Sequence, residues 1–279
     1  MPLSIFLCVI AAAAMHAGWN AVLKIRLDPF LAVVLVNAAC GLIALPIALA
    51  LGPPRLEAVP WVIGSILVHL AYYLTLTGAY RRADMGQVYP VARGSAPLMT
   101  TLFSLILLRE PIGTAGLAGV AVLALGIMTM ALTGGGRSFD RKALGLALAC
   151  GVSITAYTLL DGVGARTEGN PHVYSAWLFT GDGLLLTAFA FLCKGVSGLR
   201  PALSFALPGF AGGAMSLASY WIAIWAMTQA PIGLVAAVRE SSVLFGAIIA
   251  VVVLHEPLRP NRILAAGLIL LGLMLIRLQ

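Results

Sequence analysis

Charged side chains are scarce in this sequence. Asp, Glu, Lys and Arg make up 10% of its 279 residues, and hydrophobic residues make up 61%. In a typical soluble domain roughly a quarter of the residues are charged. A chain with so few charges cannot cover a water-facing surface. The composition therefore excludes a soluble globular protein and predicts an integral membrane protein, whose surroundings are the lipid bilayer.

The basic residues form neither a stripe nor a tail. The formal net charge is +7, but the lysines and arginines are scattered between apolar runs. Basic loops that orient helices in a membrane explain this pattern better than a nucleic-acid site does. We therefore expect no nucleic-acid partner.

Motifs of catalysis and of metal binding are also missing. The sequence has no GxxxxGK[ST], HExxH, GxSxG or paired aspartate-rich motif, and Phe179 stands where a GxGD motif needs a glycine. These absences argue against a nucleotide-driven pump and an intramembrane enzyme. The cysteines lie in apolar runs without a CxxC spacing, which argues against a disulfide or metal site: Cys8, Cys40, Cys150 and Cys193. We expect no cofactor and no metal.

The sequence does contain ten apolar runs of about 20 residues, the length that crosses a hydrocarbon core of about 30 Å. The runs are Leu3–Leu23, Pro29–Leu51, Pro60–Tyr80, Gln87–Leu108, Ile112–Thr133, Ala143–Gly162, Pro171–Cys193, Leu203–Thr228, Ile232–Leu254 and Asn261–Leu278. The first run lacks a positively charged start, so we expect a retained helix and not a signal peptide. The predicted fold class is an all-α integral membrane protein with ten transmembrane helices.

Two segments of the chain match each other 146 positions apart. VARGSAPLMTTLFSLILLREP carries Arg93 seventeen residues before the Glu-Pro pair at 110–111. AVRESSVLFGAIIAVVVLHEP carries Arg239 seventeen residues before the Glu-Pro pair at 256–257. A repeat of this length indicates a duplicated membrane unit.

A glycine-rich, charged stretch separates five runs from five. We expect a first repeat at 1–133, a linker at 134–142 and a second repeat at 143–279. An odd number of helices in each repeat forces the two repeats into opposite orientations, so the duplication is predicted to be inverted. A weaker match between Asp28-Pro29 and Asn170-Pro171 supports the same division.

Loop charges predict the orientation of the chain. The loops after the odd-numbered runs hold 11 lysines and arginines, and the opposite side holds 4. Cytoplasmic loops carry the excess of positive charge. This count predicts that both termini lie outside the cytoplasm.

The combined features resemble EamA-type proteins of the drug/metabolite transporter superfamily. They are the five-plus-five plan, the Glu-Pro pairs after the fourth and ninth runs, closing helices that carry Gly126 and Gly272, and the stretch His16-Ala17-Gly18-Trp19-Asn20. The resemblance covers nearly the whole chain. It implies ten helices around a central cavity and the transport of small metabolites, often the export of amino acids or related compounds. It also implies cytoplasmic termini, in contrast to the loop charges.

Arg93 lies inside the fourth run, between Pro90 and Pro97. Proline bends a membrane helix and frees backbone carbonyls, and such broken segments often form binding sites. An arginine at this depth can bind a carboxylate or phosphate of a substrate. It can also form a structural ion pair or extend toward the interface. Both interpretations stay open for Arg93.

Three further charged residues lie inside predicted helices. Arg239 and Glu240 are neighbours in the ninth run, and Asp182 lies between two glycines in the seventh. Adjacent helical positions point about 100° apart, so Arg239 and Glu240 need not pair with each other. We expect these three residues to couple transport to protons or to form ion pairs, with Glu240 as the main coupling candidate. Substrate contact is expected at Arg93.

Aromatic and polar residues gather at helical spacing on several runs and could line a cavity for an organic solute. The candidates are His69, Tyr72 and Tyr73 in the third run, Tyr89 in the fourth, Tyr220, Trp221 and Trp225 in the eighth, and His16, Trp19 and Asn20 in the first. The alternatives are an interfacial aromatic belt and histidines that satisfy hydrogen bonds in the core. Tyr157 is a weaker candidate, and Asp161 is expected near the interface because its run ends at Gly162.

Taken together, the sequence predicts a secondary transporter in the inner (plasma) membrane. We expect it to export a small polar or amphiphilic organic metabolite, such as an amino acid or a related compound, by alternating access of two repeats. A proton gradient is one expected driving force, and exchange along the substrate's own gradient is the other. The alternatives from other classes are an intramembrane enzyme, a channel and a structural membrane subunit.

Overall fold

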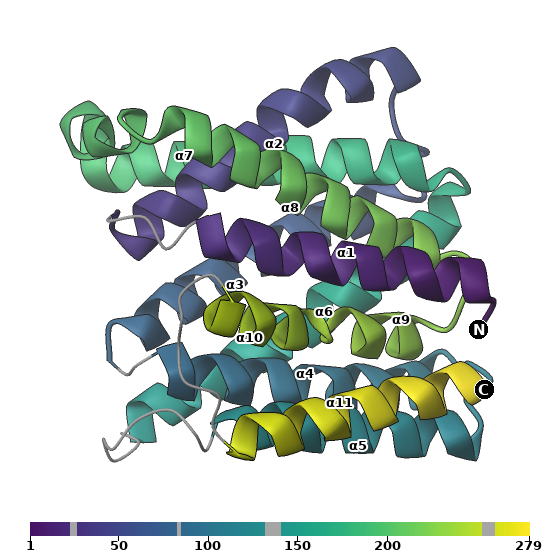
Figure 1. The fold of residues 1–279 in the computed structure, drawn as a ribbon. Coiled ribbons are helices and arrows are strands. Elements are labelled where there is room, and N and C mark those ends of the chain that lie inside the picture. The colour runs from purple at the N-terminus through teal and green to yellow at the C-terminus, as the bar shows by residue number, and fades with distance from the viewer. Residues whose placement is uncertain (23–26, 83–84, 132–140, 253–259) are drawn as a thin grey trace.

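The computed structural model describes residues 1–22, 27–82, 85–131, 141–252 and 260–279, and all regular elements in these ranges are helices. Eleven helices follow one another along the described chain (Figure 1). They are α1 (Leu3–Val22), α2 (Pro29–Leu51), α3 (Val59–Tyr80), α4 (Met85–Leu107), α5 (Thr114–Ala131), α6 (Arg141–Glu168), α7 (Pro171–Leu203), α8 (Ala206–Met227), α9 (Ile232–Arg239), α10 (Ser242–Val252) and α11 (Pro260–Leu278).

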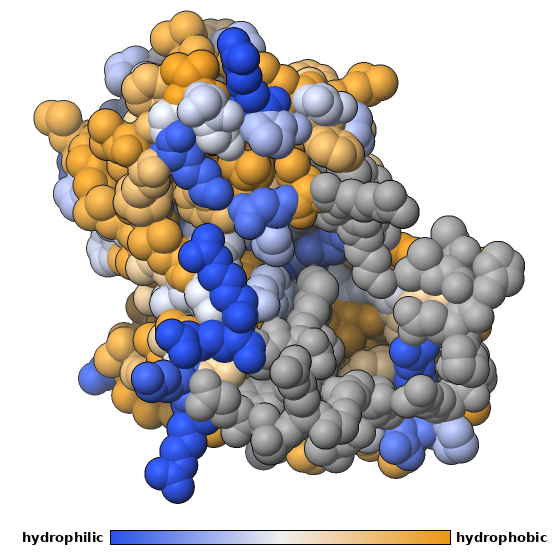
Figure 2. Space-filling view, turned by 90° about the vertical axis from the view of Figure 1, so that its left-hand side faces the viewer, coloured by the Kyte–Doolittle hydropathy of each residue, from blue (hydrophilic) through white to orange (hydrophobic). Residues whose placement is uncertain are grey.

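The helices form ten spans, which confirms the predicted fold class. Eight segments are long and apolar enough to cross a membrane, and one of them, Ile232–Val252, combines α9 and α10. The other two spans contain the shorter apolar segments Val91–Leu107 and Thr114–Met130. Large apolar side chains such as Leu42 and Leu102 are exposed on the outside of the bundle, where lipid would surround them. Apolar residues likewise dominate much of the surface in Figure 2.

Local sequence signals explain several helix boundaries. The side chain of Asp28 accepts a hydrogen bond from Leu31 N at 3.2 Å, and Pro29 follows it as the first residue of α2. Asn170 accepts from His172 N at 3.0 Å in the same way, ahead of Pro171 in α7. Both are side-chain N-caps followed by proline, a favoured helix start.

Some boundaries differ from the predicted runs. α6 begins two residues before the predicted Ala143 and continues beyond Gly162 to Glu168. α7 is one continuous helix only up to a kink, because Gly195 has φ 63° and ψ −180°. The residues that follow this kink lengthen α7 beyond the predicted end at Cys193. Residues 134–140 of the predicted linker and the Glu-Pro pair at 256–257 lie outside the described residues.

The two repeats run in opposite directions. Arg277 at the end of α11 donates to Met1 O at 3.3 Å, and Gly113 N donates to Gln279 at 2.9 Å. The start of α1, the end of α11 and the start of α5 therefore share one face, which we call the terminal face (Figure 1). The end of α6 lies at this face too, because Arg166 pairs with Glu110 just before α5 at 2.6 Å. α1 starts where its counterpart α6 ends, as an inverted repeat requires.

Glycine contacts follow the same two-fold relation. A Cβ atom added to Gly119 of α5 would come within 2.8 Å of Gly272 O in α11, and one added to Gly126 would come within 3.0 Å of Ala265 O. These two residue pairs are equivalent in the two repeats, because the offset of 146 residues relates Gly119 to Ala265 and Gly126 to Gly272. Both crossings need a residue without a side chain, because the backbones nearly touch.

A second close crossing lies between α2 and α7. A Cβ atom added to Gly41 would lie 3.1 Å from Gly183 Cα, and one added to Gly183 would lie 2.8 Å from Gly41 Cα. These two glycines stand 142 positions apart, the same offset as Asp28 and Asn170. Equivalent positions of the two repeats therefore meet each other directly, as they must where a two-fold axis passes.

Candidate functional site

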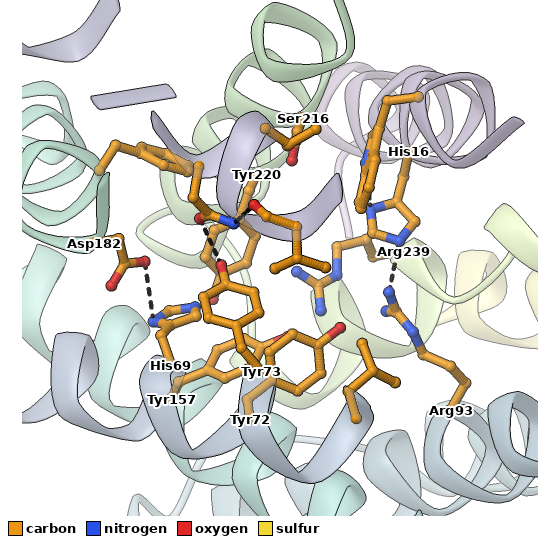
Figure 3. Close-up of a pocket in the computed structure, with 16 residues that line it drawn as sticks. His16, His69, Tyr72, Tyr73, Arg93, Tyr157, Asp182, Ser216, Tyr220 and Arg239 are labelled. Atoms are coloured by element: carbon orange, nitrogen blue, oxygen red, sulfur yellow. Dashed lines mark hydrogen bonds and ion pairs between the residues drawn. The ribbon is translucent and has the colours of Figure 1, made fainter. Parts of the chain in front are cut away.

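A cavity lies in the middle of the bundle, between the two repeats. It has a free volume of about 80 Å³. Its walls come from α1, α2, α3 and α4 of the first repeat and from α6, α7, α8 and α9 of the second (Figure 3). The lining residues are His16, Trp19, Val33, Val36, Asn37, His69, Tyr72, Tyr73, Leu76, Arg93, Tyr157, Phe179, Asp182, Ser216, Tyr220 and Arg239.

The two intramembrane arginines lie together at one end of this cavity. Arg93 Nη1 donates to Glu240 Oε1 at 2.8 Å, and Arg239 Nη2 lies 3.6 Å from the same oxygen. All three residues are buried: Arg93 is 4% exposed, Arg239 is 3% exposed and Glu240 is 2% exposed. Arg93 and Arg239 line the cavity while Glu240 stands behind them. One carboxylate from the second repeat thus contacts an arginine from each repeat.

His16 extends this cluster onto α1. Its Nε2 lies 2.5 Å from Arg93 Nη2, and its Nδ1 faces the Trp19 indole N–H at 3.3 Å. Arginine and tryptophan side chains are donors only, so each of these contacts needs a bare ring nitrogen on His16. A neutral imidazole has one bare nitrogen and a charged one has none. His16 therefore accepts a hydrogen bond from only one of the two neighbours at a time.

The helix of the ninth span is interrupted at Glu240, which is the C-cap of α9. Ser241 N bonds to Val238 O at 3.1 Å and Val243 N to Glu240 O at 3.2 Å, so the backbone forms three-residue turns here. Four consecutive residues of this break hold buried side-chain atoms with no hydrogen-bond partner among the described residues. They are Arg239 Nε, Glu240 Oε2, Ser241 Oγ and Ser242 Oγ. An unpaired buried polar atom costs about 1–3 kcal/mol, so the break is a weak point of this span.

Asp182 marks the other end of the cavity. It is 4% exposed, and its one polar contact within the described chain is His69 Nδ1, at 3.5 Å. His69 Nδ1 also lies 3.0 Å from Ser65 O, a carbonyl that can only accept, so the proton of His69 is on Nδ1. Figure 3 shows Asp182 and Arg93 on opposite sides of the cavity. The cavity therefore has an acidic side chain at one end and two basic side chains at the other.

Tyrosine rings form the wall between these two ends. Tyr157 stacks on His69 with ring centroids 4.1 Å apart, and the Arg239 guanidinium lies 4.8 Å from the centroid of the Tyr220 ring. Tyr73 donates its hydroxyl to Asn37 Oδ1 at 2.7 Å. These contacts fix the rings in place, and their faces can hold a cationic group.

The expected interfacial position of Asp161 was wrong. Asp161 is fully buried, and its carboxylate accepts hydrogen bonds from Tyr174 at 3.0 Å and from Tyr220 at 2.5 Å. The error follows from the helix length: α6 continues to Glu168, so Asp161 lies two turns from its end. Through Tyr220, this buried carboxylate supports the ring that faces Arg239.

Most of the predicted site residues meet in the cavity. Nine line it: His16, Trp19, His69, Tyr72, Tyr73, Arg93, Asp182, Tyr220 and Arg239. Four do not: Glu240 lies behind the two arginines, the Asn20 amide donates to His16 O, Trp221 donates to His172 Nδ1, and Trp225 packs against the apolar core. The side chain of Tyr89 lies outside the described residues.

Several lining residues were not among the predictions. Asn37 is the clearest omission, because a lone amide inside an apolar run is a recognisable signal. Its counterpart at the offset of 142 is Phe179, which lines the cavity as well. Ser216 and the aliphatic Val33, Val36 and Leu76 carry no comparable signal. In the described part of the chain, no three His, Cys, Asp or Glu side chains are arranged to hold a metal ion.

Comparison with known proteins shows both a similar fold and a family. A crystal structure of another protein has a TM-score of 0.79 with this chain at 20% sequence identity, and the match covers 99% of this chain and 98% of that one. At that identity the likeness shows the fold alone. The EamA-like transporter family matches residues 3–132 and again residues 141–278. The chain therefore belongs to the EamA-like transporter family and is a multi-pass membrane transporter of the drug/metabolite type, as its resemblance predicted.

Proposed function

We propose that this transporter exports a small zwitterionic metabolite, an amino acid or a close relative, across the inner (plasma) membrane. The observation that carries the proposal is the polarity of the central cavity. Arg93 and Arg239 line one end and Asp182 the other. A carboxylate can bind to guanidinium groups through charge-assisted hydrogen bonds, and an ammonium group can bind to a carboxylate.

The walls and the size of the cavity support the same class of substrate. One water needs roughly 10–15 Å³ of such space. A free volume of about 80 Å³ therefore has room for several water-sized groups. Tyr72, Tyr157 and Tyr220 add ring faces that suit an ammonium group or an aliphatic stem.

Transport would proceed by alternating access of the two repeats, at 1–133 and 143–279, joined by the linker at 134–142. A second part of the proposal is that a cavity carboxylate couples export to a proton gradient. Asp182 is the first choice, because its one polar partner in the described chain is a histidine and it faces the cavity. Glu240 is the second, since a substrate carboxylate would compete with it for Arg93 and Arg239.

The substrate is best sought by a thermal-shift screen of purified protein against zwitterionic, anionic and cationic metabolites. A ligand that binds the folded state raises its melting temperature by mass action. Any hit is then tested by counterflow in proteoliposomes, because a carrier exchanges substrate across the membrane whereas a channel does not. Stabilisation by cations alone would contradict a role of the arginines in binding.

The arginines are tested by Arg93→Ala and Arg239→Ala in folded, reconstituted protein. Loss of a charge-assisted hydrogen bond costs about 1.5–3 kcal/mol, so we expect binding to weaken about ten- to hundredfold. Arg82→Ala is the matched control, because Arg82 is exposed beyond the end of α3. Normal transport kinetics in both cavity variants would rule out carboxylate binding at this end.

Proton coupling is tested by Asp182→Asn and Glu240→Gln. In folded protein, the neutral amide at the coupling position should abolish gradient-driven accumulation, while counterflow persists at raised substrate concentration. Glu57→Gln, at an exposed carboxylate, is the control. If both cavity variants still accumulate substrate against its gradient, proton coupling through these residues is wrong.

A further inference from the structure

The Glu-Pro motif of the first repeat lies at the terminal face and contacts the second repeat. Glu110 is 6% exposed, and its Oε2 accepts a hydrogen bond from Ile232 N at 2.7 Å. The Ser104 hydroxyl donates to the same oxygen. Ile232 is the first residue of α9, whose own N-cap, Pro231, makes no side-chain hydrogen bond. A carboxylate of one repeat thus caps a helix of the other, where the helix dipole favours negative charge.

Arg166 ties this cap to two further elements. Its Nη2 lies 2.6 Å from Glu110 Oε1. The same guanidinium donates to Met227 O at 2.9 Å and to Ala230 O at 3.0 Å. The loop after α4, the end of α6 and the connection from α8 to α9 are therefore joined by two side chains, which we call the Glu110–Arg166 cluster.

The first turn of α9 is packed closely beside this cluster. A Cβ atom added to Gly233 would lie 2.7 Å from Thr101 Cα in α4, and one added to Gly162 of α6 would lie 2.7 Å from Ile232 Cγ1. The two glycines allow α9 to fit between α4 and α6. Their positions leave little free space around the start of α9.

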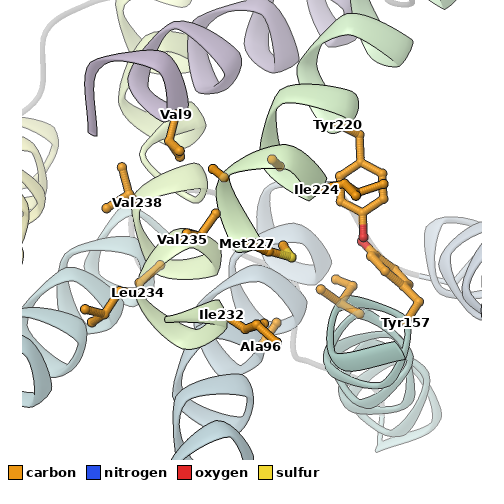
Figure 4. Packing of buried hydrophobic residues seen from close by; sticks show 14 of the residues in the cluster. Val9, Ala96, Tyr157, Tyr220, Ile224, Met227, Ile232, Leu234, Val235 and Val238 are labelled. Atoms are coloured by element: carbon orange, nitrogen blue, oxygen red, sulfur yellow. The ribbon is translucent and has the colours of Figure 1, made fainter. Parts of the chain in front are cut away.

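Apolar side chains, which we call the plug, fill the space between the Glu110–Arg166 cluster and the cavity. Tyr220 lines the cavity, and Ile224 and Met227 follow it on α8 at helical spacing, both fully buried. Ile232 packs beside them (Figure 4). The cavity is thus closed toward the terminal face.

We propose that the Glu110–Arg166 cluster is the latch that keeps the cavity closed on the terminal face, and that release of the start of α9 opens it. The latch rests on the alternating access proposed above. α9 spans the distance from Ile232 at the latch to Arg239 in the cavity, so a shift of this one helix changes the latch and the site together. The carboxylate of the Glu-Pro motif is then a conformational element of the transport cycle and makes no contact with the substrate.

The latch is tested by the reactivity of a cysteine placed in the plug. Ile224→Cys is introduced into a chain whose four natural cysteines are replaced by alanine, and a membrane-impermeant maleimide is added to the terminal face of oriented proteoliposomes. We expect Glu110→Ala to raise the labelling rate about tenfold, which corresponds to about 1.4 kcal/mol between closed and open states. Glu110→Gln should raise it less, because the amide oxygen can still accept from Ile232 N. Glu57→Gln, an exposed carboxylate in the loop after α2, should leave the rate unchanged.

Unchanged labelling in folded Glu110→Ala protein would overturn the latch. If the Glu110→Ala variant does not reach the membrane, the labelling rate is measured in Glu110→Gln and Arg166→Gln instead. Wild-type labelling rates in both of these variants would likewise overturn the latch. The assay needs no substrate, so it separates the two proposals. A protein that shows Glu110-dependent labelling but no counterflow would overturn the proposed function and leave the latch intact.

Discussion

The buried carboxylate of Glu240 is expected to be a large contributor to the stability of the bundle. Glu240→Gln removes the negative charge that Arg93 contacts at 2.8 Å and Arg239 at 3.6 Å. Two charges about 4 Å apart attract by about 4 kcal/mol at an effective dielectric constant of 20. Because all three residues are at most 4% exposed, only water inside the small cavity can replace the lost partner. Removal of one partner from a buried pair typically costs about 3–5 kcal/mol, and we expect a loss of this size.

The measurement is equilibrium unfolding in mixed micelles, performed on Glu240→Gln, Arg93→Gln and the double variant. If Arg93 and Glu240 stabilise each other, the double variant should be more stable than the sum of the single effects predicts, by about 2 kcal/mol. Glu57→Gln controls for the loss of an exposed carboxylate. A loss below about 1 kcal/mol in Glu240→Gln, or strict additivity in the cycle, would refute the reasoning.

Three further predictions follow from the packing and from the loops. Gly272→Ala should lower the free energy of unfolding by about 1–3 kcal/mol, because its Cβ would come within 2.7 Å of Gly119 O. Gly267→Ala on the same helix is the control, since its Cβ would have nothing within 4 Å and the change should be neutral or slightly stabilising. Thermal melting compares the two variants. Tyr220→Phe should lower stability by about 1–3 kcal/mol through the lost hydrogen bond to Asp161, and substrate affinity should change little because the ring under Arg239 remains; unchanged stability would show that this bond contributes nothing. The loop charges predict that a tag on the C-terminus is cleaved by protease added to intact cells, and protection of the tag would instead support the cytoplasmic termini that the family resemblance implies.

The spans could be predicted because their signals are local. An apolar run of about 20 residues identifies a span, and Asp28-Pro29 and Asn170-Pro171 identify two helix starts. The inversion followed from five spans in each repeat. The break between α9 and α10 could not be predicted in this way, because the run from Ile232 to Leu254 contains no proline. It occurs where Glu240 reaches Arg93, 147 residues earlier in the chain, and local propensity holds no information on such a partner.

The site could be predicted in part for the same reason. Intramembrane charges such as Arg93 and Asp182 are conspicuous in a sequence, and both line the cavity. Which charges pair depends on how the repeats dock. The sequence favoured substrate contact at Arg93 and ion pairing at Arg239, but in the structure Arg93 makes the shorter contact with Glu240 and both arginines line the cavity. Trp221 and Trp225 were expected in the cavity as part of one aromatic surface with Tyr220. Adjacent helical positions point about 100° apart, and only Tyr220 lines the cavity.

The scaffold is nearly symmetric while its charges are not, and packing explains why. Glu240 corresponds to Gly94 in the first repeat. A Cβ atom added to Gly94 would lie 3.1 Å from Met128 Cγ and 3.6 Å from Ile127 Cγ2, so this position faces α5 and has no room for a carboxylate. A chain with Gly94→Glu and Glu240→Gly keeps its composition of charges, but we expect it to fold less well than Glu240→Gly alone. If the exchange instead restored stability, the carboxylate could serve from either repeat, and the asymmetry of the site would not be a consequence of packing.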